Sequence, residues 1–237
     1  MRAGSSLIRL PQRSLSRVAA FAAGAAVLAG SVIMLVALVA APGPWLRGYV
    51  SEAGTAGQPY AGTYRTGLLV LALGAALLAV ALSPRSRPAA ALLVAASLFA
   101  GTSGAVSCSA GCPLPPYEPT TVADVVHASA SILGLFLIAG AMVAVALAPV
   151  RLAARRLAAG AAAVIVPLGA VLGLSMLFVG RSALGAALER LILAVAVGWL
   201  IGASVVTLLT PGWPRSDTVT PWSVGQNSRS WRARRSR

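Results

Sequence analysis

Six long apolar runs, separated by short polar segments, divide the chain. They cover about residues 18–41, 66–82, 89–106, 122–147, 157–179 and 191–209. Each run is close to the roughly 20 residues with which a helix crosses a hydrocarbon layer of about 30 Å. The runs are rich in Ala and Leu and do not alternate apolar with polar residues, so helices are predicted rather than strands. We therefore expect an all-α fold, a polytopic transmembrane bundle of six helices.

The segments that flank the bundle are polar and rich in arginine. Residues 1–17 are predicted to form a basic cytoplasmic arm, residues 18–210 the six-helix transmembrane domain, and residues 211–237 a disordered basic cytoplasmic tail. The first apolar run has about 24 residues, whereas the apolar core of a signal peptide has about 7–15. A retained signal anchor is therefore favoured over a cleaved signal peptide.

The composition agrees with a membrane protein. The chain is 58% hydrophobic and only 10% charged, whereas a soluble domain has about 45–50% apolar and about 25% charged residues. So few charged side chains could not cover the surface of a soluble globule of 237 residues. The abundance of Leu, Val and Ala also excludes a chain that is disordered outside its two ends.

The positive charge predicts an orientation in the membrane. All 19 basic residues are arginines, and five acidic residues leave a net charge of +14. Most arginines fall on the side of the two termini: Arg2, Arg9, Arg13, Arg17, Arg85, Arg87, Arg151, Arg155, Arg156, Arg215, Arg229, Arg232, Arg234, Arg235 and Arg237. The opposite side carries only Arg47, Arg65, Arg181 and Arg190. Because positive residues beside spans stay in the cytoplasm, we expect both termini to be cytoplasmic and the protein to lie in the cytoplasmic (cell) membrane.

The basic tail leaves two interpretations open. It can simply retain the last span in place, with an aromatic anchor at the span end, or it can lie on anionic lipid, where each arginine contributes roughly 1 kcal/mol. No nucleic-acid-binding fold or base-stacking platform accompanies the charge, so no nucleic-acid partner is predicted. The lipid bilayer is the expected partner.

Two glycine pairs have the spacing at which transmembrane helices approach closely. Gly169 and Gly173 lie in the fifth run, and Gly198 and Gly202 lie in the sixth. Small residues four apart let helix backbones meet in lipid. The pairs are interpreted as packing sites within the bundle, with a homodimer interface as the alternative. Pro167 is expected to kink the fifth helix.

The two cysteines of the chain lie in one predicted outer loop. Cys108 and Cys112 are four residues apart, on the face where thiols become oxidised, so a structural disulfide is the leading interpretation. Redox chemistry usually uses Cys-x-x-Cys on a thioredoxin-like helix, which is missing here. A zinc site needs three or four ligands, and Cys108, Cys112 and His127 supply three at best. No metal and no cofactor are predicted.

Ionisable residues gather at the predicted outer ends of the helices. Asp124 and His127 are three apart and share one helix face. Thr121 and Asp124 also match a capping box, which gives Asp124 a structural alternative. If the bundle brings spans two, four and six together, a candidate outer polar patch forms from Glu52, Arg65, Asp124, His127 and Arg190.

The two outer loops resemble those of a known membrane family. YVSE at 49–52, QPY at 58–60 and YRTG at 64–67 are similar to the first outer loop of the family catalogued as "domain of unknown function 998". CSAGCPLP at 108–115, followed by Asp124 and His127, is similar to its second. The resemblance covers about residues 15–210 and leaves the tail unmatched. It implies a six-span bacterial or archaeal membrane protein, and it implies no particular activity.

Three classes of function stay open at this point. The leading hypothesis is a multi-pass membrane protein with a structural, sensory or accessory role and no catalytic centre. Pro167, the glycine-rich helices and the polar outer patch favour a small transporter or lipid-handling protein, although no inverted repeat or central charge is visible. The third hypothesis is an outward-facing enzyme that uses Glu52, Asp124 and His127 for acid–base chemistry on a lipid headgroup. No nucleophile motif accompanies that patch.

Overall fold

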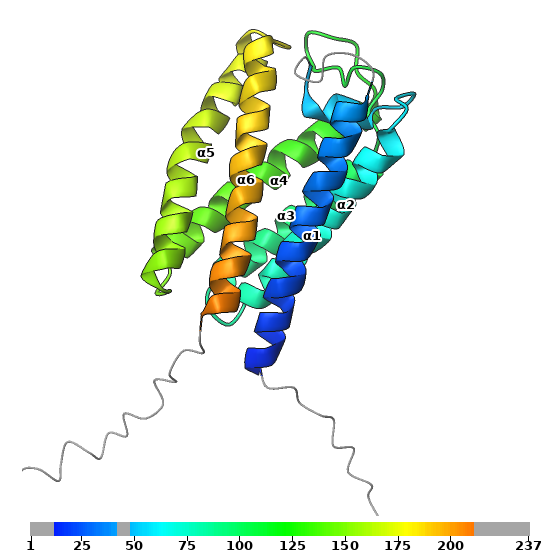
Figure 1. Ribbon diagram of the computed structural model, residues 1–237. Helices are drawn as coiled ribbons and strands as arrows, with labels where there is room; N and C mark the ends of the chain where they lie inside the picture. Colours follow the sequence, from blue (N-terminus) through cyan, green and yellow to red (C-terminus); the bar gives the residue numbers. More distant parts are fainter. Residues whose placement is uncertain (1–11, 42–47, 211–237) are drawn as a thin grey trace, which may run out of the picture.

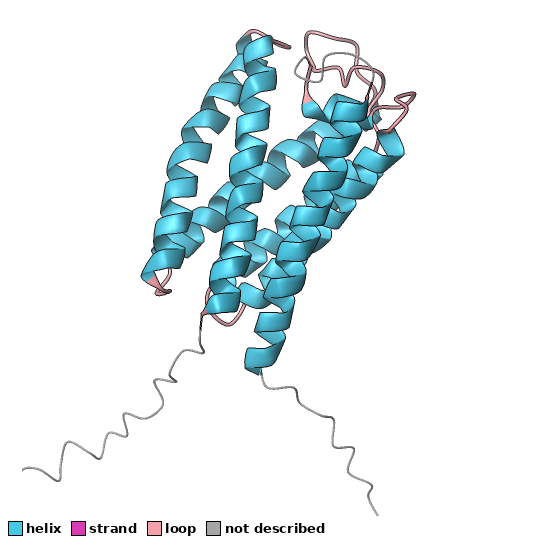
Figure 2. Ribbon diagram, in the orientation of Figure 1, coloured by secondary structure: helices cyan, strands magenta, loops and turns pink. Residues whose placement is uncertain are grey.

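The computed structural model describes residues 12–41 and 48–210, and within these ranges the chain is helical, with loops and no strand (Figure 2). The helices are α1 Gln12–Ala40, α2 Ala61–Leu82, α3 Arg87–Ala105, α4 Val122–Leu147, α5 Leu152–Phe178 and α6 Ala183–Leu209. A short 3₁₀ helix, η1, covers Val50–Gly54. The predicted all-α bundle of six helices is confirmed. The tail at 211–237 and most of the N-terminal arm lie outside the described residues.

All six helices are long and apolar enough to cross a membrane. Large apolar side chains cover their outer surfaces, among them Phe21, Phe136 and Phe178, which are 65%, 78% and 72% exposed. In water such a surface would be unstable, whereas lipid tails solvate it well. The protein is therefore a multi-pass membrane protein.

Four helices begin at least five residues earlier than the apolar runs predict. The α1 helix starts at Gln12 instead of about residue 18, and α2 at Ala61 instead of about 66. The α5 helix starts at Leu152 instead of about 157, and α6 at Ala183 instead of about 191. Charged residues occupy each of these first turns or lie close behind them, as Glu189 and Arg190 do in α6. A hydropathy pattern assigns charged residues to loops, but a helix accommodates them wherever its end leaves the hydrocarbon layer.

Local caps fix several of these helix starts. The Ser86 hydroxyl accepts a hydrogen bond from the amide of Ala89 at the start of α3, and Ser182 does the same for Gly185 at the start of α6. Such side chains satisfy amides that have no partner within the helix. The α5 helix continues through Pro167.

The bundle has two distinct ends (Figure 1). The α1 helix begins and α6 ends at one end, which we call the terminal end. The opposite loop end holds residues 48–60, 106–121 and 179–182. The α1 helix packs against α2 and α6, while α4 packs against α3 and α5. The α4 helix crosses behind α6, so that α4 and α5 diverge toward the loop end (Figure 1).

The closest helix contact is made by glycines other than the two predicted pairs. A Cβ atom on Gly30 of α1 would lie 2.6 Å from the Gly67 carbonyl oxygen of α2, and one on Gly67 would lie 2.8 Å from the Gly30 oxygen. A Cβ on Gly74 would lie 2.6 Å from Val27. Small residues therefore let the backbones of α1 and α2 touch, as the general rule for lipid-embedded helices requires.

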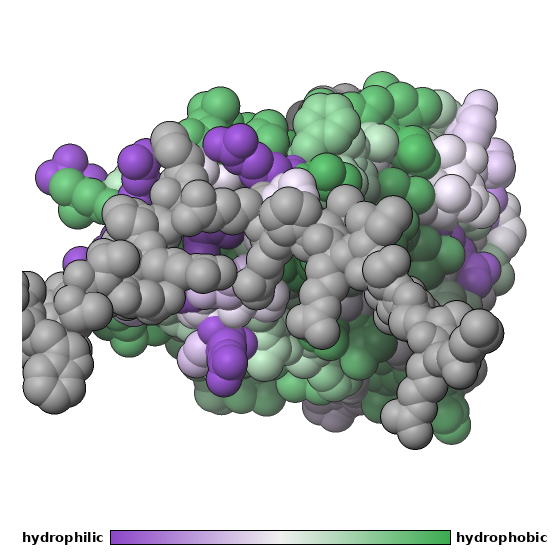
Figure 3. Space-filling model, turned by 90° about the horizontal axis from the view of Figure 1, so that it is seen from below, coloured by the Kyte–Doolittle hydropathy of each residue, from purple (hydrophilic) through white to green (hydrophobic). Residues whose placement is uncertain are grey.

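The charged residues are divided between the two ends. Described arginines at the terminal end are Arg17, Arg85, Arg87, Arg151, Arg155 and Arg156. Seen from that end, hydrophilic groups interrupt the hydrophobic surface (Figure 3). The loop end carries Arg65, Arg181 and Arg190 together with Glu52, Glu118, Asp124 and Glu189. The four acidic residues of the described chain thus lie together at the loop end.

Candidate functional site

Arg181 connects three loops at the loop end. Its guanidinium forms an ion pair with Glu52 of η1 and donates a hydrogen bond to the Gly111 carbonyl oxygen in the loop between α3 and α4. A second carboxylate, that of Glu118, lies 3.9 Å away. Glu52 in turn accepts a hydrogen bond from the Tyr49 amide at 2.8 Å. One cation therefore holds together segments that are far apart in the sequence.

Asp124 anchors the second loop to the start of α4. Its carboxylate accepts hydrogen bonds from the amide and hydroxyl of Thr121 and from the amide and hydroxyl of Ser109, at 2.6–2.9 Å. The capping box with Thr121 that the sequence favours is present. The side chain is buried, and its lone pairs are occupied. Asp124 therefore has a structural role in this arrangement.

Two ionisable side chains close the C-terminal end of α3. Arg65 donates hydrogen bonds to the carbonyl oxygens of Gly104 and Ala105, at 2.9 and 2.5 Å. His127 Nδ1 lies 2.9 Å from the carbonyl oxygens of both Ser103 and Val106. The last carbonyls of a helix have no partner within it, and they carry partial negative charge, so cationic or donor groups suit them. Arg65 thereby serves α3 and does not line the cavity described below.

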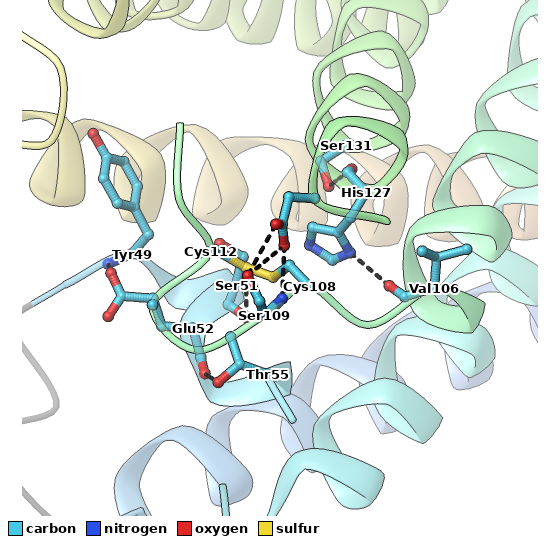
Figure 4. Close-up of a disulfide and its surroundings, with 12 residues drawn as sticks. Tyr49, Ser51, Glu52, Thr55, Val106, Cys108, Ser109, Cys112, His127 and Ser131 are labelled. Carbon is cyan, nitrogen blue, oxygen red and sulfur yellow. Dashed lines mark hydrogen bonds between the residues drawn. A yellow bond between two sulfur atoms is a disulfide. The ribbon is translucent and has the colours of Figure 1, made fainter. Parts of the chain in front are cut away.

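The hydrogen bonds of His127 also define its tautomer. Carbonyl oxygens can only accept, so Nδ1 carries the proton of the neutral ring and Nε2 presents a lone pair. Nε2 is buried and has no hydrogen-bond partner among the described residues. Figure 4 shows the ring between Val106 on one side and the two cysteines on the other. A ring nitrogen of His127 and both sulfur atoms lie within 4.8 Å of one another.

Cys108 and Cys112 form a disulfide in this structure (Figure 4). Cys108 is 2% exposed, whereas Cys112 is partly exposed and has a φ of 45°, in the left-handed region. Non-glycine residues rarely adopt that conformation. Cys108, Cys112 and His127 are also the three residues considered above as zinc ligands. Zinc binds cysteine as the thiolate, and a disulfide offers no thiolate. In the disulfide state, the imidazole of His127 is therefore the one ligand of the three that remains.

Glu189 ties α6 to the first loop. Its Oε2 accepts a hydrogen bond from the Val50 amide at 2.5 Å. Tyr49, which precedes Val50, packs its ring against α6. The contact is so close that a Cβ on Gly185 of α6 would overlap the phenol oxygen. Burial raises the pKa of the Tyr49 hydroxyl, which therefore keeps its proton at neutral pH.

A cavity of about 380 Å³ lies between α4, α5 and α6 beneath these loops. Its walls are mainly apolar, with polar groups toward the loop end. Those polar groups belong to Tyr49, Ser51, Cys108, Cys112, Asp124, His127, Ser131 and Glu189. The opposite part is lined by α4 and α5 residues, among them Phe136, Ile165 and Gly169. Its size is within the roughly 300–1,000 Å³ typical of ligand sites.

The structure divides the predicted outer patch into separate contacts. Asp124 and His127 both line the cavity, whereas Glu52, Arg65 and Arg190 do not. Arg190 donates hydrogen bonds to the Gly48 and Ala186 carbonyl oxygens. Within the described residues, no hydrogen bond or ion pair joins Glu52, Asp124 and His127 to one another. Glu189 of α6 is a second acidic residue that lines the cavity with Asp124 and His127.

Arg181 and Glu189 were not predicted from the sequence to be site residues. Arg181 is an isolated arginine in a short turn, and its partners are 129 and 70 residues away in the chain. Glu189 is the one carboxylate within α6. An ionisable residue within a span is a functional candidate by default, and this signal could have identified it. Predicting that span from about residue 191 placed Glu189 outside it and removed this signal.

The fold and the site define a six-helix membrane protein with a cavity that is covered at one end by loops, one of which is closed by a disulfide. The chain belongs to the family described as "Protein of unknown function (DUF998)", whose pattern it matches over residues 5–206. This match confirms the resemblance that the two loops carry. No curated protein and no solved structure matches the chain.

Proposed function

We propose that this protein lies in the cytoplasmic membrane and uses the cavity to bind a single-chain amphipathic molecule from the bilayer. The observation that carries the proposal is the division of the cavity wall. Polar groups of His127, Glu189 and Tyr49 stand at the loop end, and apolar side chains of α4 and α5 line the remainder. A ligand with a polar group and an apolar chain matches both parts.

Access from the lipid supports a membrane-derived ligand. Ile132 and Phe136 of α4 and Val166 of α5 line the cavity and are also exposed, at 54%, 78% and 53%. These residues therefore stand at a lateral opening on the outer surface of the bundle. An apolar molecule can pass through such an opening without entering water, which would cost it roughly 0.8 kcal/mol per methylene.

Small residues give this opening its width. Gly169 and Gly173 line the cavity, and a Cβ atom on either would meet nothing within 4 Å. Gly169 and Gly173 were predicted to form a helix contact or a homodimer interface, and within one chain they leave space in the cavity wall. Gly202 packs against Leu157, so the second pair also has an intramolecular contact. A homodimer through either pair stays a prediction.

A cavity-filling substitution tests the proposal. In Gly169→Leu the new side chain would extend into the cavity and exclude a ligand chain. We expect covalent photolabelling by hexadecanol that carries a diazirine to map to α4 and α5 in the parent protein, and to fall at least fivefold in the variant. The measurement is peptide mapping by mass spectrometry after irradiation in lipid nanodiscs.

Gly198→Leu is the matched control. Gly198 is an exposed helix glycine whose Cβ would also meet nothing within 4 Å, and it does not line the cavity. Labelling should be unchanged there. Equal labelling of α4 and α5 in all three proteins, or labelling spread evenly over the outer surface of every helix, contradicts the proposal.

The acid–base enzyme alternative has less support. The Asp124 carboxylate already accepts hydrogen bonds from Thr121 and Ser109, and Glu52 is paired with Arg181. Neither is therefore available as a general base. The orientation that the arginines predict, with both termini cytoplasmic, belongs to this proposal and would direct the loop end to the outside. Anionic lipid at the basic tail concerns residues outside those described.

A further inference from the structure

We propose that the Cys108–Cys112 pair is redox-active and delivers two electrons to a lipid quinone held in the cavity, with His127 as the proton acceptor. This inference rests on the proposed function, since the quinone is the amphipathic ligand. It assigns a chemical activity to the two cysteines that close a loop and to the histidine that binds carbonyl oxygens at the end of α3.

The first observation is that both cysteines line the cavity. Most of a structural disulfide's effect comes from restraining the loop, and that effect does not require contact with a ligand site. Here the two sulfur atoms belong to the wall between the outer loops and the apolar space. A ligand that enters from the lipid would therefore reach the sulfur atoms with its polar end.

The second observation is the arrangement of His127. Its Nδ1 proton is held by the Ser103 and Val106 carbonyl oxygens, while a ring nitrogen lies within 4.8 Å of both sulfur atoms. Nε2 is buried with no hydrogen-bond partner in the described chain. A fixed imidazole with an open lone pair beside a thiol is the arrangement that produces a thiolate, the reactive form of cysteine.

The third observation is the difference between the two cysteines. Cys112 is partly exposed, whereas Cys108 is buried, so an outside thiol would approach the disulfide from the side of Cys112. With the disulfide formed, the backbone of Cys112 is in the left-handed region, which non-glycine residues rarely adopt. Exposed or strained disulfides are more readily reduced than buried, relaxed ones. This asymmetry favours Cys112 as the attacked atom and Cys108 as the leaving group.

The cycle balances as follows. A thiolate of an external dithiol attacks Cys112 Sγ, the Cys108–Cys112 bond breaks, and Cys108 leaves and takes up a proton. The second external thiol attacks the mixed disulfide, which releases an oxidised external disulfide and the Cys108–Cys112 dithiol. His127 then accepts the Cys108 proton, and the Cys108 thiolate adds to the quinone ring. Cys112 Sγ attacks Cys108 Sγ, the bond from Cys108 to the quinone breaks, and its electron pair stays on the quinone. The protons from His127 and from the Cys112 thiol pass to the two quinone oxygens and give a quinol. Ser51 lines the same space, and its hydroxyl can donate a hydrogen bond to a quinone oxygen.

The experiment uses the full chain in lipid nanodiscs. The disulfide is reduced with a phosphine, the phosphine is removed, and ubiquinone with one isoprene unit is added. Free thiols and quinone absorbance are then followed with time. We expect one quinone to be reduced for each pair of thiols lost. The rate should fall at least tenfold in His127→Asn and in Gly169→Leu, and stay unchanged in Gly198→Leu.

His127→Asn is chosen because the asparagine amide can still donate to the α3 carbonyls while it removes the basic nitrogen. An unchanged thermal midpoint for this variant separates loss of chemistry from loss of fold. If its rate matches the parent, His127 is not the proton acceptor and the inference is wrong.

Two further outcomes overturn the inference and leave the proposed function standing. In the first, the quinone blocks photolabelling of the cavity by the diazirine alcohol, but the thiols are not oxidised. In the second, the reduced protein binds one Zn²⁺ through Cys108, Cys112 and His127, and the metal protects the thiols. If the quinone neither competes with the label nor oxidises the thiols, and the label itself does not map to the cavity, both proposals fail.

Discussion

Ionisable side chains at the loop end mostly satisfy backbone groups that the helices leave open. Arg65 and His127 bind carbonyl oxygens at the end of α3, and Asp124 binds amides at the start of α4. A backbone group buried without a partner costs about 1–3 kcal/mol, so these contacts stabilise the loop cover of the cavity. Of the three, only His127 has a buried side-chain polar atom, Nε2, without a hydrogen-bond partner among the described residues.

Arg181 is the residue whose loss should loosen this cover most. In Arg181→Gln the ion pair with Glu52 and the hydrogen bond to Gly111 are both lost, and Glu52 is left without its cation. We expect the free energy of unfolding to fall by roughly 1–3 kcal/mol, since hydrogen bonds to charged groups have this size. The thermal midpoint in detergent, followed by circular dichroism, measures the change.

Arg156→Gln provides the comparison for that variant. Arg156 is an exposed arginine at the terminal end, and its removal should alter stability by less than about 0.5 kcal/mol. If both variants unfold at the parent temperature, Arg181 does not hold the loops together in the way the structure indicates.

Residue-level prediction from sequence succeeded where the interaction is local. The contact between Thr121 and Asp124 spans three residues and follows a known pattern, so the capping box could be predicted. The partners of Arg181 depend on how three loops fold over the bundle, and no spacing rule encodes them. The open lone pair of His127 likewise depends on where α3 ends, which only the tertiary structure shows.

At the scale of helices, the contact between α1 and α2 depends on Gly67. A methyl group there would lie 2.8 Å from the Gly30 carbonyl oxygen and 2.9 Å from the Met34 amide nitrogen. Backbone atoms cannot turn away as a side chain can, so the two helices must separate. We expect Gly67→Ala to destabilise the protein by roughly 1–3 kcal/mol, measured as a lower thermal midpoint in detergent.

Gly62→Ala, in the same helix, is the matched variant. A Cβ at Gly62 would meet nothing within 4 Å, and alanine favours a helix over glycine by about 1 kcal/mol, so this protein should be as stable as the parent or more so. A Gly67→Ala protein that is equally stable would show that α1 and α2 do not meet at these glycines.

The helices themselves could be predicted because their signal is long and repeated. The α4 helix was expected at about 122–147 and is observed at Val122–Leu147, where Thr121 and Pro149 mark its two limits. Which helices touch was not predictable, because glycines are common in all six runs and spacing alone does not identify a partner. The predicted pair Gly169 and Gly173 proved to line a cavity, while Gly30 and Gly67 form the contact.

For the whole molecule, the arginine distribution predicts that the loop end faces outward. In a protein with Cys108 and Cys112 replaced by serine, a single cysteine at the exposed position Gln58 should react with a membrane-impermeant maleimide on intact cells. A single cysteine at Ser83, at the terminal end, should react only after permeabilisation. The reverse pattern would invert the topology and place the cavity cover in the cytoplasm.

The central claim is that the cavity between α4, α5 and α6 holds a molecule taken from the membrane. Native mass spectrometry of the protein extracted from its own membrane tests this claim most directly. We expect one added mass per chain, which fragmentation identifies as a single-chain amphiphile, in the parent and in Gly198→Leu, and its absence in Gly169→Leu. A parent protein that carries no added mass, or the same mixture of bulk phospholipids on all three proteins, would contradict the claim.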